Sequence, residues 1–328
     1  MNRFDRLEAR SLAQAAEAAA AGATVKAGGI DLLDLMKEGL VAPRRIVGLR
    51  GVPGLAAIEE APDGGLRIGA AATLAEVAAH ALVRARYRAL ADAAGQAASP
   101  QIRNVATIGG NLLQRPRCWY FRSRHHRCLR KGGEACFAFA GENQSHAIFA
   151  HDGCAIVHPS TPATALVAFG ASVELVAPGG RARVVPLERF FVLPAQDIER
   201  ENDLQKGEIL ASVRLAARPG ARSAHLRQGE LDSFDWPLAD VAAVLDVDGA
   251  GACRAASIVL GAAAPVPYRA ARAERALAGK PVTEETARAA ARAALEGALP
   301  LSGNANKLPI FEALVRRTIL EAMKGTRT

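Results

Sequence analysis

Short apolar runs alternate with polar and small residues along the chain, and their spacings predict an alternation of helices and strands. Apolar positions three or four residues apart favour helices, and short β-branched runs favour strands. The helices expected before residue 218 cover residues 10–21, 32–38, 82–98 and 163–169, with another beginning at Leu74. The strands expected there cover residues 24–26, 45–49, 66–69, 172–176 and 210–215, with another beginning at Ala155. This order indicates a compact mixed fold.

A second structural unit is expected after Pro219-Gly220, a dipeptide typical of a turn or boundary. The strands expected in this unit cover residues 239–247 and 255–260, and the helices cover residues 268–278, 284–296 and 309–323. A chain of 328 residues is long enough for two or three domains, each with its own core.

Residues 114–154 interrupt this regular pattern with many charges and glycines and little periodicity. Such a long loop is uncommon in a compact domain unless it has a function. It contains four of the five cysteines, Cys118, Cys128, Cys136 and Cys154. Their spacing matches neither the compact ferredoxin run nor the paired cysteines of zinc sites. From the residues alone, iron–sulfur, zinc and chance all remain open, and Cys253 is expected to be a buried apolar residue.

Charge is unevenly distributed over the chain, whose net charge is +8. Between residues 115 and 131 lie seven arginines and lysines and two histidines without an acidic residue. The aromatic residues of this stretch form one block, so nucleic-acid binding is not favoured. We expect the charge to compensate an anionic metal cluster or to meet an acidic protein partner.

Targeting signals do not change this picture. Apolar runs stay shorter than the roughly 18 residues of a membrane span, so we expect no membrane span. The N-terminal residues MNRFDRLEAR lack the apolar core of a secretory signal, which favours the cytoplasm unless a partner carries the chain into the periplasm. A framework of disulfides is not expected.

Two glycine turns, at residues 27–31 and 107–111, are candidates for binding an anionic cofactor. Glycine lacks a Cβ, so backbone N–H groups there can approach a pyrophosphate closely at the start of a helix. Neither turn has the G-x-G-x-x-G or Walker pattern, so Rossmann and P-loop folds lack support. Single Gly-Gly turns are most often plain turns, and the residues alone do not name the ligand.

Three segments resemble the FAD-binding subunits of xanthine-oxidase-family molybdenum hydroxylases: AGGIDLLDLMK at 27–37, SPQIRNVATIGGNL at 99–112 and LGAAAPVPYRAARAERALAG at 260–279. The insert RCWYFR…CLRKGGEACFA…HAIF…CAIVHPS resembles the iron–sulfur branch found in periplasmic aldehyde oxidoreductases, and a four-cysteine insert also occurs in the 4-hydroxybenzoyl-CoA reductase branch. The resemblance implies an α+β chain with a two-subdomain FAD-binding fold of the vanillyl-alcohol-oxidase/PCMH type, over residues 1–57 and 58–218. The iron–sulfur insert would span 114–154, and an antiparallel sheet with helices would form a C-terminal domain over 219–328.

The resemblance also implies cofactor ligands. The pyrophosphate and adenosine side of FAD would be lined by Lys26, Ala27, Gly28, Gly29, Ile30, Asp31, Leu32 and Leu33. The rest of the diphosphate and the ribityl chain would be held by Thr107, Gly109, Gly110 and Asn111, with Trp236 near the flavin ring. Two positions depart from the family: Thr161 replaces an aspartate that usually supports the FAD, and Arg227 is the one positive charge kept from a basic segment. The four clustered cysteines would ligate a [4Fe–4S] cluster.

The resemblance implies an electron-transfer subunit that is not catalytically complete alone. Its partners would be a large molybdopterin subunit and a small [2Fe–2S] subunit, in a heterotrimer or a dimer of heterotrimers, together with an external electron acceptor. Two alternatives remain: a structural subunit with weakened or lost FAD, suggested by Thr161 and residues 227–231, and a stand-alone flavin oxidase. The oxidase would need its own acid–base residues around a substrate, and no such constellation is recognisable.

Overall fold

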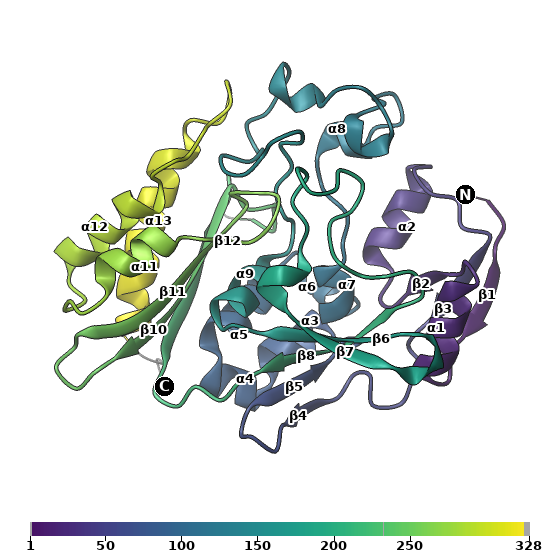
Figure 1. Ribbon diagram of the computed structural model, residues 1–328, viewed down its shortest axis with the longest axis horizontal. Helices are drawn as coiled ribbons and strands as arrows, with labels where there is room; N and C mark the ends of the chain where they lie inside the picture. Colours follow the sequence, from purple (N-terminus) through teal and green to yellow (C-terminus); the bar gives the residue numbers. More distant parts are fainter. Residues whose placement is uncertain (1, 232, 325–328) are drawn as a thin grey trace.

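The computed structural model describes residues 2–231 and 233–324, and its strands form three sheets within these residues (Figure 1). The first sheet is parallel, in the order β1-β3-β2, with β1 (Asp5–Glu8), β2 (Thr24–Lys26) and β3 (Arg45–Gly48). Two helices, α1 (Leu12–Ala20) and α2 (Ile30–Lys37), connect these strands. The short segment between β2 and α2 is the first glycine turn.

The second sheet is antiparallel and has the order β4-β5-β8-β6-β7. Its strands are β4 (Ile58–Glu60), β5 (Leu66–Gly69), β6 (Ser172–Val176), β7 (Ala182–Pro186) and β8 (Ile209–Leu215). The helices between β5 and β7 are α3 (Leu74–Ala79), α4 (Ala81–Arg86), α5 (Arg88–Gln96), α6 (Pro100–Arg103), α7 (Ile108–Leu112), α8 (Trp119–Arg122), α9 (Thr161–Ala168) and three 3-10 turns, η1 (Leu129–Lys131), η2 (Phe137–Phe139) and η3 (Pro178–Gly180). The short helix α10 (Leu187–Phe190) follows β7.

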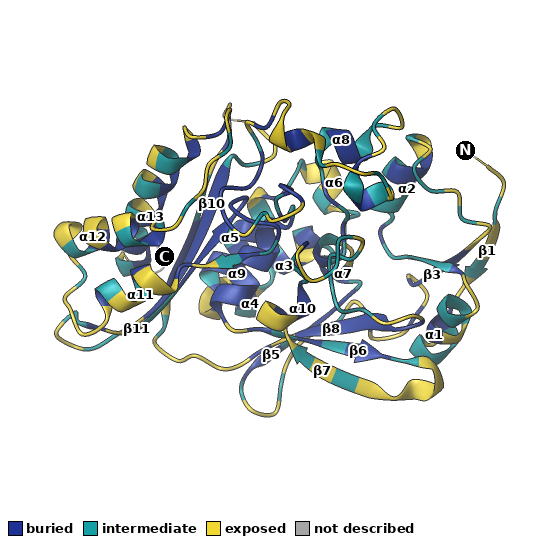
Figure 2. Ribbon diagram, turned by 45° about the horizontal axis from the view of Figure 1, so that its top comes forward, coloured by how far each residue is buried: buried dark blue, intermediate teal, exposed yellow. Residues whose placement is uncertain are grey.

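The third sheet is also antiparallel, in the order β12-β11-β10-β9, and carries helices on one face (Figures 1 and 2). Its strands are β9 (Arg222–Gln228), β10 (Ala239–Val247), β11 (Cys253–Gly261) and β12 (Tyr268–Arg269). The helices are α11 (Ala271–Leu277), α12 (Glu284–Ala294) and α13 (Lys307–Met323), whose inner alanine and leucine residues are buried. The α+β class with a C-terminal antiparallel sheet is therefore confirmed.

The helix α9 joins the second and third sheets into one core. All eight of its residues are buried, which agrees with its apolar sequence TPATALVA. Leu166 belongs to the same apolar cluster as Val244 of β10 and Val259 of β11. Because the N-terminus of α9 also meets the second glycine turn, described below, the core sets the position of the candidate site.

Three predicted elements are wrong. The helix expected over 82–98 is broken at Tyr87, which has φ −134° and ψ 51°, into α4 and α5. Burial of the Tyr87 ring against Phe169 and its hydrogen bond to the carbonyl of Ala216 outweigh local helix propensity. No strand begins at Ala155, because this backbone bonds irregularly to residues 147 and 264. The helix expected at 268 begins at 271, because Tyr268 pairs with β11 and stacks on Phe149.

Candidate cofactor sites

The two glycine turns touch each other. Gly28 has so little space that a Cβ there would lie 2.1 Å from the carbonyl oxygen of Val105, two residues before Thr107. Gly29 adopts φ +87°, a left-handed conformation that side chains rarely tolerate, and forms the N-cap of α2. The turn after β2 and the segment before α7, which are far apart in the sequence, thus form one continuous surface.

The turns differ in what their N–H groups can offer an anion. No described side chain caps the N-terminus of α2, so the first-turn N–H groups are suited to a phosphate. In the second turn, the N–H of Gly109 donates to the carbonyl of Ala70, at 2.9 Å. The N–H of Gly110 donates to Thr107 Oγ1, at 3.2 Å. The N–H groups of Gly109 and Gly110 are therefore already hydrogen-bonded within the chain. A phosphate would find more free N–H donors at the first turn.

Asn111 is bonded to Ser160, the residue directly before Thr161. Ser160 Oγ donates to Asn111 Oδ1 at 2.5 Å and accepts from the N–H of Ala163, so it caps α9 and ties α7 to it. Thr161 is the first residue of α9 and is buried. A hydroxyl here brings no charge to the site.

Asp31 links the first glycine turn to the distant Trp236. One carboxylate oxygen of Asp31 lies 2.9 Å from an Arg117 nitrogen, and the Arg117 guanidinium lies 4.9 Å from the centre of the exposed Trp236 ring. Arg227 donates to the carbonyls of Gln96 and Asp235, so it holds the segment before Trp236 rather than pointing a free charge at a ligand. Asp31, Arg227 and Trp236, three of the predicted FAD residues, are therefore linked through these contacts.

The arginines of the insert form internal clamps. Arg122, whose side chain is 9% exposed, pairs with Asp31, Asp34 and Glu38 of the α2 segment. Arg115 and Arg130 both pair with Glu201, at 2.9 Å each. These cations anchor the insert, because Arg115, Arg117, Arg122 and Arg130 are all paired with carboxylates of the chain itself.

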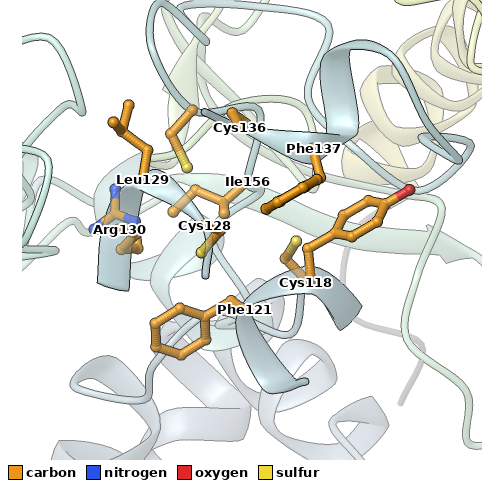
Figure 3. A pocket seen from close by; sticks show the side chains of 10 residues that line it. Cys118, Phe121, Cys128, Leu129, Arg130, Cys136, Phe137 and Ile156 are labelled. Atoms are coloured by element: carbon orange, nitrogen blue, oxygen red, sulfur yellow. The ribbon is translucent and has the colours of Figure 1, made fainter. Parts of the chain in front are cut away.

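The four clustered cysteines line one small cavity (Figure 3). Its other lining residues are Tyr120, Phe121, Leu129, Arg130, Phe137 and Ile156. Cys118 immediately precedes α8, Cys128 precedes η1 and Cys136 precedes η2, while Cys154 lies in the returning segment. All are free thiols, and no three His, Cys, Asp or Glu side chains in residues 2–231 and 233–324 form a ready site for a metal ion.

The cavity places the thiols in different electrostatic environments. Burial raises the pKa of Cys118 to about 11. The hydrogen bond between Cys136 and Cys154 lowers the pKa of Cys136 to about 6 and raises that of Cys154. Cys128 and Cys154 are buried, whereas Cys118 and Cys136 are partly exposed. Four thiols from separate turns thus converge on one cavity, and four thiolates are the donor set that an iron–sulfur cluster takes.

The insert is also anchored to the C-terminal helices. The buried Asn143 donates to the carbonyl of Ala138 and accepts from the N–H of Gly303. The carbonyl of His146 accepts from Lys307 Nζ at 2.9 Å and from Asn304 Nδ2 at 3.1 Å. These bonds hold the segment between Cys136 and Cys154 against the start of α13.

Several of these residues escaped the sequence analysis. Glu201, Asn143 and Lys307 lie far from the cysteines in sequence, and no motif connects them to the insert. His146 Nε2 lies 3.2 Å from Cys118 Sγ, a hydrogen bond that no motif in the sequence predicts. Burial and the positive Lys307 lower the pKa of His146 to about 4, so its ring is neutral near pH 7.

The fold and the paired glycine turns define a flavoprotein of the molybdopterin dehydrogenase type. Residues 2–217 match the family described as "FAD binding domain in molybdopterin dehydrogenase", and residues 224–322 match "CO dehydrogenase flavoprotein C-terminal domain". The chain therefore belongs to the FAD-binding subunits of xanthine-oxidase-family molybdenum hydroxylases, and it is an oxidoreductase subunit with a role in electron transfer.

Individual relatives agree with this assignment. The aldehyde oxidoreductase FAD-binding subunit PaoB of Escherichia coli K12 is 36% identical over 76% of this chain and 77% of its own length. The xanthine dehydrogenase FAD-binding subunit of Escherichia coli O157:H7 is 27% identical over 92% and 89%. A chain of quinoline 2-oxidoreductase from Pseudomonas putida 86 superposes with a TM-score of 0.78 at 26% identity, covering 100% of this chain and 99% of that one. None of the described helices is long and apolar enough to cross a membrane.

The contact between the glycine turns leads to a first prediction. Gly28→Ala should destabilise the fold by about 1–3 kcal/mol, because its Cβ would overlap the Val105 carbonyl, as in other overpacked sites. The flavin content of the purified chain should fall as the two turns separate. Gly249→Ala is the control, since a Cβ there meets nothing within 4 Å. Denaturant unfolding and flavin absorbance would measure both effects, and wild-type values for Gly28→Ala would contradict the proposed contact.

Lys307 leads to a second prediction. Burial lowers the pKa of Lys307 from 10.5 to about 7, so above pH 7 the unfolded chain keeps a proton that the folded chain has lost. Stability therefore gains from this group as the pH rises from 7 towards 10, by about 1 kcal/mol per pH unit. Lys307→Met should remove that gain. Between pH 7 and pH 9, the difference in unfolding free energy between wild type and Lys307→Met should change with pH. The exposed Lys280→Met is the control, and its difference from wild type should stay constant over the same range.

Proposed function

We propose that this chain carries both FAD and a [4Fe–4S] cluster, and that it passes electrons from a molybdenum subunit through these cofactors to an external acceptor. The convergence of Cys118, Cys128, Cys136 and Cys154 on one cavity is the observation that carries the proposal. When bound, the flavin would exchange electrons in pairs or singly and the cluster would exchange one at a time.

The chain's own residues would bind and orient these cofactors. The free N–H groups of α2 would hold a phosphate of FAD beside Gly28 and Gly29, and Asn111 would be oriented by Ser160. Trp236, stacked on Arg117, would border the flavin side. The other residues that line the cavity would surround the cysteine sulfurs. In this proposal residues 1–57 and 58–218 form the two FAD subdomains, and residues 219–328 form the C-terminal domain.

The proposal extends to the partners. The relatives include medium and FAD-binding subunits of carbon monoxide, xanthine and nicotinate dehydrogenases. We therefore propose a large molybdopterin subunit and a small [2Fe–2S] subunit as partners, with an aldehyde or a heterocycle as the substrate of the complex. The 36% identity to an aldehyde oxidoreductase subunit favours the aldehyde.

Metal analysis tests the cluster. Anaerobically purified wild type should contain about four irons and four labile sulfides per chain. Serine at Cys118, Cys128, Cys136 or Cys154 should lower the iron content sharply, because each variant loses a ligand. Cys253→Ser should keep the iron, since Cys253 lies in β11, in the C-terminal core. One equivalent of zinc, or full iron content in each single-serine variant, would contradict the cluster.

Co-purification tests the proposed electron transfer through partner subunits. The chain tagged in its native host should co-purify with two other subunits and with molybdenum. Aldehyde oxidation should appear only in that assembly, because the described residues offer no acid–base site for a substrate. If the isolated chain, loaded with flavin and iron, oxidised an aldehyde by itself, it would be a stand-alone oxidase. If it bound no flavin at all, it would be a structural subunit.

A further inference from the structure

The imidazole of His146 contacts the sulfur of Cys118. Nε2 lies 3.2 Å from Cys118 Sγ, and the histidine is 3% exposed. With a free thiol, either atom could donate the hydrogen. A thiolate that ligates iron carries no proton, so the contact can persist beside a cluster only if Nε2 is the donor. The other ring nitrogen, Nδ1, is buried and has no hydrogen-bond partner among the described residues.

The position of the ring is fixed from two sides. The backbone N–H of His146 donates to the carbonyl of Asn143, and the backbone carbonyl of His146 accepts hydrogen bonds from Lys307 and Asn304. The ring of Trp119 meets the imidazole edge-on, with centroids 4.9 Å apart. The insert and the start of the C-terminal helix α13 therefore hold the imidazole against Cys118. A histidine on a mobile surface segment would lack these restraints.

We propose that His146 is a positioning residue of the iron–sulfur site, which donates an N–H···S hydrogen bond to Cys118 and thereby raises the cluster's reduction potential. This inference rests on the cluster in the proposed function. Reduction adds a negative charge that is shared with the ligand sulfurs, and hydrogen bonds to charged acceptors are stronger than those to neutral ones. The bond therefore stabilises the reduced state more than the oxidised state, as hydrogen bonds to cluster sulfurs do generally.

Redox titration of the whole complex, followed by EPR, tests the inference. His146→Leu should lower the equilibrium constant for cluster reduction about tenfold, which corresponds to about 59 mV towards more negative potential for one electron. His146→Gln, whose amide can donate, should recover part of the shift. His151→Leu is the matched control, because His151 lies in the same segment but contacts the carbonyl of Leu299. If the role of His146 were purely structural, the glutamine and leucine variants would have the same reduction potential.

Pulsed EPR on wild type carrying isotopically labelled histidine provides a test that needs no variant to fold. One weakly coupled histidine nitrogen should be detected on the reduced cluster and should be lost in His146→Gln. A strong coupling would mean that histidine is itself a ligand, and no coupling would mean that the hydrogen bond is absent. Either result would overturn the inference, as would an unchanged potential in His146→Leu with full iron content.

The same samples separate this inference from the function on which it rests. If wild type contains no iron, the proposed cluster fails and the role of His146 fails with it. If wild type contains the cluster and the His146 variants leave its potential and EPR spectrum unchanged, only the role of His146 fails. If His146→Leu loses its iron, the inference is tested by the potential of His146→Gln and by the nitrogen coupling in labelled wild type.

Discussion

The carboxylate of Asp31 is the interaction on which the arrangement of both candidate sites depends. It lies in the first turn of α2, directly after the glycine turn, and it accepts from the backbone N–H of Arg115 and from the Arg117 and Arg122 side chains. The same group therefore supports the start of the insert and the helix that would bind a phosphate. Because removal of one partner from a largely buried ion pair costs about 3–5 kcal/mol, neither site can be displaced freely from the other.

The insert is hydrogen-bonded both to the N-terminal part of the chain and to the C-terminal domain. Its beginning is bound to α2 through Asp31, and its middle is bound to the start of α13 through Asn143 and His146. Beneath it, α9 runs through the shared core and presents Ser160 to Asn111. A cluster held by the four cysteines would thus lie between the flavin region and the C-terminal domain, within one rigid network of hydrogen bonds. Electron transfer between two cofactors benefits from such a fixed separation.

Local patterns predicted most of the fold, and long-range contacts account for the misses. The sequence pattern located α1, β2, α9 and α13 to within a few residues. It could not foresee the break at Tyr87, because Phe169 and Ala216, far along the chain, cause it. The residues alone singled out the glycine turns and the cysteines, and the resemblance assigned their ligands. It gave no hint of Asp31 as the anchor of the insert or of His146 beside Cys118, since both depend on pairings between distant segments.

Diffraction at the iron absorption edge, from crystals of the intact complex, would test the central claim most directly. The account predicts anomalous density for four irons among Cys118, Cys128, Cys136 and Cys154. It also predicts FAD density whose phosphates lie at the N-terminus of α2, beside Gly28 and Gly29. Anomalous density elsewhere, an empty cysteine cavity in iron-replete crystals, or a flavin bound away from both glycine turns would contradict it.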